Sequence, residues 1–185
     1  MPHIDLQAGL PGIIGLFRFR PETAKPLNEL AEVLLRGPST LSRGERELIA
    51  TLVSHRNRCE FCTNSHSEFA KLQLEDGEKT VAAVKTDYTS AEISPKLKAL
   101  LSIAAQVQTS GLSVQPVTVA DARDKGASDT EIHDTVLIAA AFCMYNRYVD
   151  GLATLPPPDP KAYDMIGKKI VEEGYRFEPS QSELA

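Results

Sequence analysis

The strongest constraint on the fold is a set of helix-start signals with no competing strand pattern. Ser42 with Glu45, and Ser128 with Glu131, have the spacing of a capping box, in which each side chain bonds to the other residue's backbone N–H. No segment shows a convincing alternation of apolar and polar residues, and no Asn-Gly hairpin turn is present. The sequence therefore predicts an all-α fold, a helical bundle.

Apolar periodicity and capping signals place the individual helices. They predict helices over residues 42–55, 59–72, 78–85, 94–108, 117–125 and 128–152, and a last helix that ends at Gly174. The proline-rich stretch 155–160 should form a rigid connector, and the polar tail from Glu178 should be loosely ordered. The small-residue run from Ala139 to Ala141 should permit close helix contact and favours a homo-oligomer.

Length and charge limit the number of domains and the kinds of partner. A chain of 185 residues can bury one core and is hardly long enough for two, so we expect one all-α domain over 1–185, with a core motif at 40–75 and a C-terminal helix and tail at 159–185. The net charge of -5 provides no basic stripe for nucleic acid. No apolar run approaches the ~20 residues of a membrane-spanning helix, and no secretory signal is recognisable. We expect a cytoplasmic protein that binds neither nucleic acid nor membranes.

Two of the three cysteines lie in the stretch "RCEFCTNSHSEFA", as C-x-x-C followed by a histidine. On a helix, Cys59, Cys62 and His66 would lie within about 60° of one another, so their side chains could converge. Both cysteines would fall in the first helical turn, where unpaired backbone N–H groups and the helix dipole favour a thiolate. His66, one turn later, could accept or return the proton. This arrangement is suited to thiol redox chemistry.

The spacing of Cys59, Cys62 and His66 alone is compatible with three interpretations of this cluster. A redox disulfide is the interpretation we favour. A structural zinc site is the second, but it needs a fourth ligand from a distant position, for which the candidates are Glu47, His55, His133 and Cys143. An inert buried cysteine pair is the third.

One glutamate occupies an unusual position on the preceding predicted helix. Glu47 lies opposite the apolar face of that helix, and its neighbours there are the small residues Ala50, Thr51 and Ser54. Small side chains would allow another helix to approach the carboxylate closely. A glutamate on an ordinary solvated face would not need such neighbours.

The stretch "GERELIATLVSHRNRCEFCTNSHSEFA" resembles the core motif of the alkylhydroperoxidase D / carboxymuconolactone decarboxylase superfamily, in its peroxidase-related branch. That motif is a glutamate, eleven intervening residues and then C-x-x-C-x-x-x-H, and Glu47, Cys59, Cys62 and His66 match it at every spacing. Residues 10–35 and 128–154 resemble the same superfamily. The likeness thus covers most of the chain before residue 155.

The resemblance implies a thiol-dependent peroxidase that reduces hydroperoxides and needs no metal or organic cofactor. In that family the second cysteine attacks the peroxide, the first resolves it, and the glutamate and histidine form a proton relay. These roles would fall to Cys62, Cys59, Glu47 and His66. The resemblance also implies a homo-oligomer, and a peroxidase would need a thiol or disulfide reductase as electron donor. The alternative is a metal-binding or non-catalytic helical oligomeric protein of the same superfamily.

The chain differs from each branch of the superfamily at one feature of the motif, and residues 145–151 form a further polar stretch. The alkylhydroperoxidase branch has another histidine directly before its second cysteine, where this chain has Phe61, so the implied relay is shorter. The decarboxylase branch lacks the cysteine pair, so its lactone chemistry is not implied here. In "YNRYVDG", residues 145–151, polar side chains interrupt an apolar run, and we expect an internal salt bridge or a subunit contact there.

Overall fold

The computed structural model describes residues 1–175, which contain nine α-helices and one short 3-10 helix. They are α1 (Gly12–Phe19), α2 (Pro21–Arg36), α3 (Arg43–Arg56), α4 (Glu60–Lys71), α5 (Gly77–Asp87), α6 (Pro95–Thr109), η1 (Gly111–Ser113), α7 (Pro116–Asp124), α8 (Asp129–Gly151) and α9 (Lys161–Glu173). These residues contain no strand, and the all-α prediction is confirmed. The tail predicted to be loose from Glu178 lies outside the described residues.

The helix boundaries follow the local signals in the sequence. Both capping boxes form: Ser42 Oγ accepts from the Glu45 N–H at 3.2 Å and Glu45 Oε2 accepts from the Ser42 N–H at 2.8 Å, with the same two distances between Ser128 and Glu131. Gly174, at the end of α9, has a φ of +88°, a left-handed conformation that glycine adopts without strain. The predicted helices did not include α1 and α2, which the structure adds.

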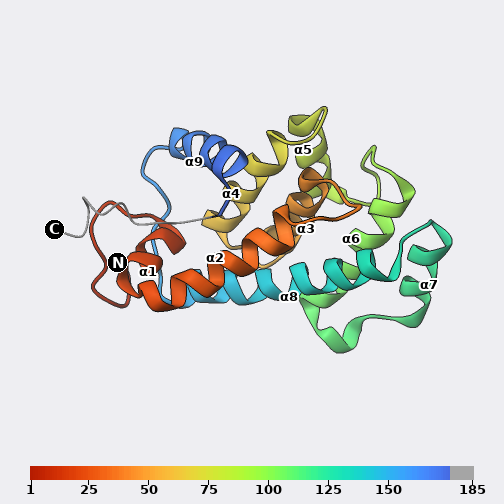
Figure 1. Cartoon of the computed structure of the whole chain (residues 1–185), viewed down its shortest axis with the longest axis horizontal. Helices are drawn as coiled ribbons and strands as arrows, with labels where there is room; N and C mark the ends of the chain where they lie inside the picture. The colour runs from red at the N-terminus through yellow and green to blue at the C-terminus, as the bar shows by residue number, and fades with distance from the viewer. Residues whose placement is uncertain (176–185) are drawn as a thin grey trace.

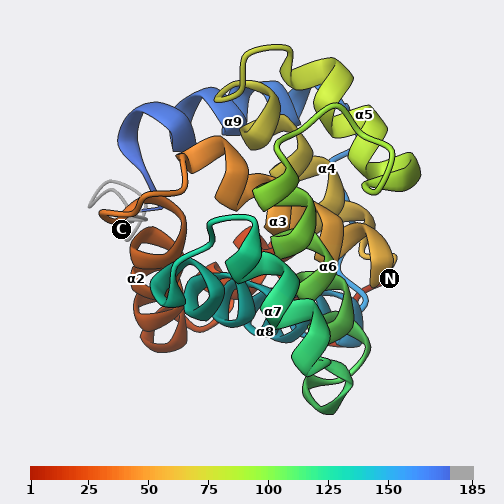
Figure 2. The same ribbon diagram turned by 90° about the vertical axis from the view of Figure 1, so that its right-hand side faces the viewer.

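Helix α3 lies at the centre of the bundle (Figures 1 and 2). Every residue from Arg46 to Ser54 is buried, because α2, α4, α5, α6 and α8 all pack against α3. Helix α4 lies between α3 and α9, so the C-x-x-C helix is covered on one side by the core and on the other by the last helix. The core is built from the aliphatic residues of α3, α6 and α8, including Leu48, Ile103 and Ile138.

Glu131 joins three parts of the bundle in addition to capping α8. Its Oε1 atom accepts from Thr40 Oγ1 at 2.9 Å and from Lys96 Nζ at 2.7 Å. Burial acts to raise the pKa of this carboxyl, but the hydrogen bonds from Lys96, the Ser128 backbone and Thr40 outweigh it and lower the pKa to about 2. The carboxylate thus fastens α8 to α6 and to the α2–α3 connection.

The small-residue run in α8 packs mainly inside the chain. Ala139 and Ala141 are buried in the core, and only Ala140 between them is exposed. The close contact that these residues permit is therefore largely a contact within one molecule.

Among the described residues, no helix combines the length and the apolar character needed to cross a membrane.

Candidate functional site

The turn between α3 and α4 sets the position of the cysteine pair. Asn57 in this turn donates through Nδ2 to Asn146 Oδ1 on α8 at 2.8 Å, and its Oδ1 accepts from Gln108 Nε2 on α6 at 2.8 Å. Asn146 in turn donates to Ser54 Oγ at 3.1 Å. Side chains from two other helices thus fix the turn that leads into the C-x-x-C motif.

Both cysteines lie at the start of α4, as predicted. Cys59 is the N-cap residue and Cys62 is the third helical residue. Both thiols are free, and their residues are only 0% and 4% exposed. Their apolar surroundings include Phe61, Val149 and Tyr163. The pair therefore lies buried in a largely apolar pocket.

The two sulfur atoms differ in their hydrogen bonding. The pKa of Cys59 is raised by its hydrogen bond with Cys62 and then by burial. Asp150, near the end of α8, is also a hydrogen-bond partner of Cys59, and burial raises the pKa of Asp150. Cys59 thus remains a thiol that can donate to the sulfur of Cys62.

The contact of Asp150 with Cys59 differs from the expectation for residues 145–151. Neither Arg147 nor Asp150 forms an ion pair with another described residue. Arg147 instead donates to the Cys143 carbonyl one turn earlier at 2.8 Å. The stretch therefore supports the cysteine pair through Asp150 and the α3–α4 turn through Asn146.

Glu47 and His66 meet across the contact between α3 and α4. The distance from Glu47 Oε2 to His66 Nδ1 is 2.7 Å, and both residues are buried. Ala50, Thr51 and Ser54, the small neighbours of Glu47, are fully buried, which allows the two helices to lie close together. An ionised carboxylate only accepts hydrogen bonds, so with Glu47 charged the hydrogen of His66 lies on Nδ1. In the neutral ring, Nε2 is then free to accept a proton.

Aromatic rings surround the imidazole of His66. Phe69 and Phe142 meet it edge to face, with ring centroids 5.1 and 4.5 Å away, and Tyr175 lies nearly parallel to it at 6.3 Å. These rings come from α4, α8 and the segment after α9. They restrict the ring of His66 to one orientation.

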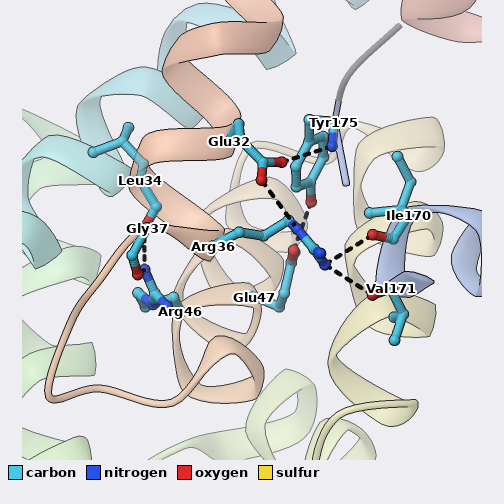
Figure 3. A network of polar contacts seen from close by, with 9 residues as sticks. All are labelled: Glu32, Leu34, Arg36, Gly37, Arg46, Glu47, Ile170, Val171 and Tyr175. Carbon is cyan, nitrogen blue, oxygen red and sulfur yellow. Dashed lines mark hydrogen bonds and ion pairs between the residues drawn. The ribbon is translucent and has the colours of Figure 1, made fainter. Parts of the chain in front are cut away.

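Tyr175 is a site residue that the sequence analysis missed. Its hydroxyl donates to Glu47 Oε1 at 2.5 Å (Figure 3). Because Oε2 of Glu47 contacts His66 Nδ1, each carboxylate oxygen has a separate partner. Burial, followed by the neighbouring charge of Glu47, raises the pKa of Tyr175 well above its ordinary value, so the hydroxyl keeps its hydrogen. The two residues are 128 positions apart, and no spacing rule connects them.

The structure brings together all four predicted site residues as two contacting pairs, Cys59 with Cys62 and Glu47 with His66. The other candidates for a fourth zinc ligand lie elsewhere: His55 and His133 are exposed, and Cys143 contacts Asn57 and Gln108. Within residues 1–175, no group of three or more His, Cys, Asp or Glu side chains is placed to hold one metal ion.

A cavity of about 340 Å³ lies beside the cysteine pocket. Its lining includes Glu60, Asn64 and Ser67 on one side of α4, and Tyr163 of α9. Neither cysteine lines it, but Tyr163 also belongs to the apolar cluster around the cysteines. Tyr163 therefore separates the cavity from the dithiol.

Comparison with protein-family models gives two matches to the model described as the carboxymuconolactone decarboxylase family, over residues 21–88 and 75–155. Together they span more than half of the chain. The chain belongs to this family. Both matches lie within the described residues, and the first includes Glu47, Cys59, Cys62 and His66. Membership confirms the resemblance found in the sequence.

Two solved structures of other proteins share the fold. An uncharacterized peroxidase-related protein with an alkylhydroperoxidase AhpD core from Ralstonia eutropha JMP134 aligns with a TM-score of 0.75 and 23% identity, over 85% of this chain and 81% of that one. An uncharacterized peroxidase-related protein from Silicibacter sp. TM1040 aligns with a TM-score of 0.74 and 23% identity, over 90% of this chain and 81% of that one. A comparison with curated proteins found no match.

Proposed function

We propose that this family member is a thiol-dependent peroxidase that reduces hydroperoxides through its Cys59–Cys62 pair. The observation that supports the proposal best is the 2.7 Å contact between Glu47 Oε2 and His66 Nδ1, on the helix face that also bears Cys62 one turn earlier. An ordinary buried cysteine pair would not need a buried acid–base pair beside it. General acid–base assistance of this kind typically increases a rate by ~10²–10⁴-fold.

The first step proposed is attack by Cys62 on the hydroperoxide. His66 Nε2 takes the proton from the Cys62 thiol, and Glu47 stabilises the positive charge that forms on the ring. The thiolate attacks one peroxide oxygen and the O–O bond breaks. His66 then returns the proton to the departing alkoxide. The products are an alcohol and a sulfenic acid on Cys62, so the sulfur has been oxidised by two electrons and the peroxide reduced by two.

The second step forms the disulfide. Cys59 attacks the sulfenic sulfur of Cys62, the S–O bond breaks, and the oxygen leaves as water with the thiol proton of Cys59. Asp150, which contacts Cys59, is placed to receive that proton on its way out. An external dithiol, such as a disulfide reductase, then returns two electrons to restore the dithiol.

The test is to mix the reduced protein with one equivalent of hydrogen peroxide and to map the thiols by mass spectrometry. We expect a Cys59–Cys62 disulfide with Cys143 still free. Replacing Cys62 by Ser should abolish the sulfenic acid, whereas Cys59→Ser should let it accumulate because no resolving thiol remains. A disulfide that includes Cys143, or thiols that all survive peroxide, would show the assignment to be wrong.

Two measurements test the alternatives. Metal analysis after purification under reducing conditions tests the metal-binding function, since a zinc site would retain about one ion per chain. Alkylation under native conditions tests the non-catalytic function, because an inert buried pair should react no faster than the half-buried Cys143.

A further inference from the structure

We propose that Tyr175 is a positioning residue for the Glu47–His66 pair, and that it acts by fixing the orientation of the Glu47 carboxylate. This inference rests on the proposed peroxidase function for its kinetic consequence but not for its structural one. The family motif ends at His66, and Tyr175 lies beyond the residues that match the family model. Its role therefore depends on the geometry of this chain.

The first support is the hydrogen bond from the tyrosine. Glu47 is 1% exposed, and no Lys or Arg side chain forms an ion pair with it among the described residues. A buried carboxylate needs hydrogen-bond donors to remain charged. Tyr175 supplies one donor to Oε1 at 2.5 Å, which leaves Oε2 for His66 Nδ1. With both oxygens engaged, the carboxylate plane cannot rotate away from the imidazole.

The second support is that Tyr175 also contacts the other half of the pair. Its ring lies 6.3 Å from that of His66, with only 14° between the ring planes, and it meets Phe69 edge to face at 6.2 Å. One side chain thus bonds to the acid and stacks beside the base. A tyrosine that merely filled the core would not be expected to do both.

The third support is a polar network that holds the backbone of Tyr175 in place (Figure 3). Glu32 Oε2 on α2 accepts from the Tyr175 N–H at 2.8 Å, and Glu32 Oε1 accepts from Arg36 Nε at 3.3 Å. Arg36 Nη1 donates to the Ile170 and Val171 carbonyls at the end of α9, both at 2.9 Å. The end of α9 is thereby tied to α2, and Tyr175 follows directly after it.

Gly174 makes this approach possible. A Cβ atom on residue 174 would lie 2.5 Å from Glu32 Oε2 and 3.1 Å from Arg36 Nε, and the φ of +88° is itself unfavourable for other residues. Any other residue at this position would strain the backbone and displace the Glu32 carboxylate from the Tyr175 N–H, so glycine favours this turn from α9 into the core. The network and the turn together direct the tyrosine hydroxyl towards Glu47.

The consequence is a defined tautomer of His66. With Tyr175 bonded to Oε1, Oε2 of Glu47 stays directed at His66 and accepts from Nδ1–H, so Nε2 is the basic atom of the neutral ring. Without the hydroxyl, the carboxylate loses one of its two donors and can rotate away from Nδ1. His66 would then populate both tautomers, and only one of them can accept the thiol proton through Nε2.

The experiment compares wild type with Tyr175→Phe and with Tyr145→Phe as matched control. Tyr145 is a buried tyrosine whose hydroxyl donates to the Leu27 carbonyl at 2.9 Å, so both variants lose one buried hydrogen bond and keep an aromatic ring. Imidazole ¹⁵N NMR at about pH 8 reports the tautomers of the neutral rings. We expect His66 to carry its hydrogen on Nδ1 in wild type and in Tyr145→Phe, and a mixture of tautomers in Tyr175→Phe.

The kinetic measurement is the rate of Cys62 oxidation by hydrogen peroxide as a function of pH. Tyr175→Phe should react about tenfold more slowly than Tyr145→Phe near neutral pH, a part of the ~10²–10⁴-fold available to acid–base assistance. The deficit should shrink as rising pH ionises the thiol without help from the base.

The outcomes separate the two proposals. A wild-type His66 protonated on Nε2, or a Tyr175→Phe protein with the wild-type tautomer, overturns the positioning role whatever the rate does. Where the wild type does reduce peroxide, a rate in Tyr175→Phe equal to that of Tyr145→Phe also overturns it. A wild type that leaves peroxide unreduced, but whose tautomer still depends on Tyr175, supports the positioning role and removes the peroxidase function.

Discussion

Glu47 and His66 are 19 residues apart in the sequence, and their Oε2 and Nδ1 atoms lie 2.7 Å apart between two neighbouring helices. This contact makes the imidazole a base with a fixed orientation, because the acid holds one ring nitrogen and the aromatic rings around it restrict rotation. The cysteine pair begins the same helix that carries the histidine. Glu47, His66 and the cysteine pair therefore lie on two helices packed directly against each other, or at their ends.

Removing either member of the acid–base pair should slow the oxidation of Cys62. We expect Glu47→Gln and His66→Ala each to lower the peroxide rate about 100-fold near neutral pH, at the lower end of the range for general acid–base catalysis. The deficit should become smaller as the pH rises, because more of the thiol ionises directly. Stopped-flow measurements with His55→Ala as control test this, since His55 is exposed and outside the site. Parent-like rates for both variants would assign the pair a structural role only.

Asp150 should affect the second step and leave the first unchanged. Its side chain contacts Cys59, and partial desolvation raises its pKa, so it can exchange a proton closer to neutral pH than an aspartate in water. We expect Asp150→Asn to form the Cys62 sulfenic acid at the parent rate and to close the disulfide several-fold more slowly. Trapping the sulfenic acid over time gives both rates. Asp164→Asn, which alters a surface pair with Lys168, is the control and should behave as wild type. A slower first step in Asp150→Asn would contradict this assignment.

The parts of the structure that were predictable from the sequence are those governed by local interactions. The capping boxes of Ser42–Glu45 and Ser128–Glu131 need only residues three apart, and both form as predicted. The position of Glu47 among small residues correctly indicated a close helix contact, because that contact depends on the face of a single helix. Motif spacing then linked this glutamate to His66.

The remaining site features depend on tertiary contacts that no local rule encodes. Tyr175 reaches Glu47 because the segment after α9 turns back into the core, which Glu32 and Gly174 make possible from distant positions. Residues 145–151 were expected to form an internal salt bridge or a subunit contact, because polar side chains there interrupt an apolar run. Asp150 forms no ion pair with another described residue. Only the packing of α8 beside the start of α4 brings it to Cys59.

The expected homo-oligomer has a testable surface on α8. Leu137 and Met144 are 37% and 44% exposed, and Ala140 lies exposed between them on the same helix face. We expect light scattering at micromolar concentration to give a multiple of the chain mass of 20.2 kDa, and Leu137→Lys/Met144→Lys to reduce it. Val33→Lys, which changes an exposed apolar residue on another helix, is the control. A wild-type monomer would remove the oligomer prediction, and equal effects of all the substitutions would remove α8 as the interface.

Glu131 should make stability depend on pH in the acid range. Its pKa is about 2 in the folded chain, against about 4.3 in an unfolded chain. The ionised group therefore stabilises the fold fully above about pH 5, and this contribution is lost as the pH falls from there towards 2. The difference corresponds to about 3 kcal/mol in the free energy of unfolding. Denaturant unfolding should show Glu131→Gln less stable than wild type at pH 7, with a gap that narrows to about half by pH 3.

The matched control for Glu131 is Glu45→Gln. Glu45 has the same third position in the capping box of α3, but its carboxylate forms no ion pair with another described residue. Glutamine can still complete a capping box, so this variant should lose less than about 1 kcal/mol. Equal losses in the two variants would show that the cap alone, and not the contacts to Lys96 and Thr40, accounts for the effect.

Tyr175 should make stability depend on pH in the alkaline range, with the opposite sign. Its folded pKa lies well above the value of about 10 expected in the unfolded chain, because burial and the Glu47 charge disfavour the phenolate. The protonated hydroxyl therefore contributes its full stability below pH 10. Above that, the unfolded chain releases a proton that the folded chain retains, and the contribution falls by about 1.4 kcal/mol per pH unit. Tyr175→Phe should lack this pH dependence, so its unfolding free energy should converge on that of wild type between pH 10 and 11.

Tyr145, whose pKa is raised to about 12 by burial, provides a comparison, because Tyr145→Phe should lose a similar pH dependence. If Tyr175→Phe instead runs parallel to wild type from pH 8 to 11 while Tyr145→Phe converges, the phenol is not held protonated against the Glu47 carboxylate.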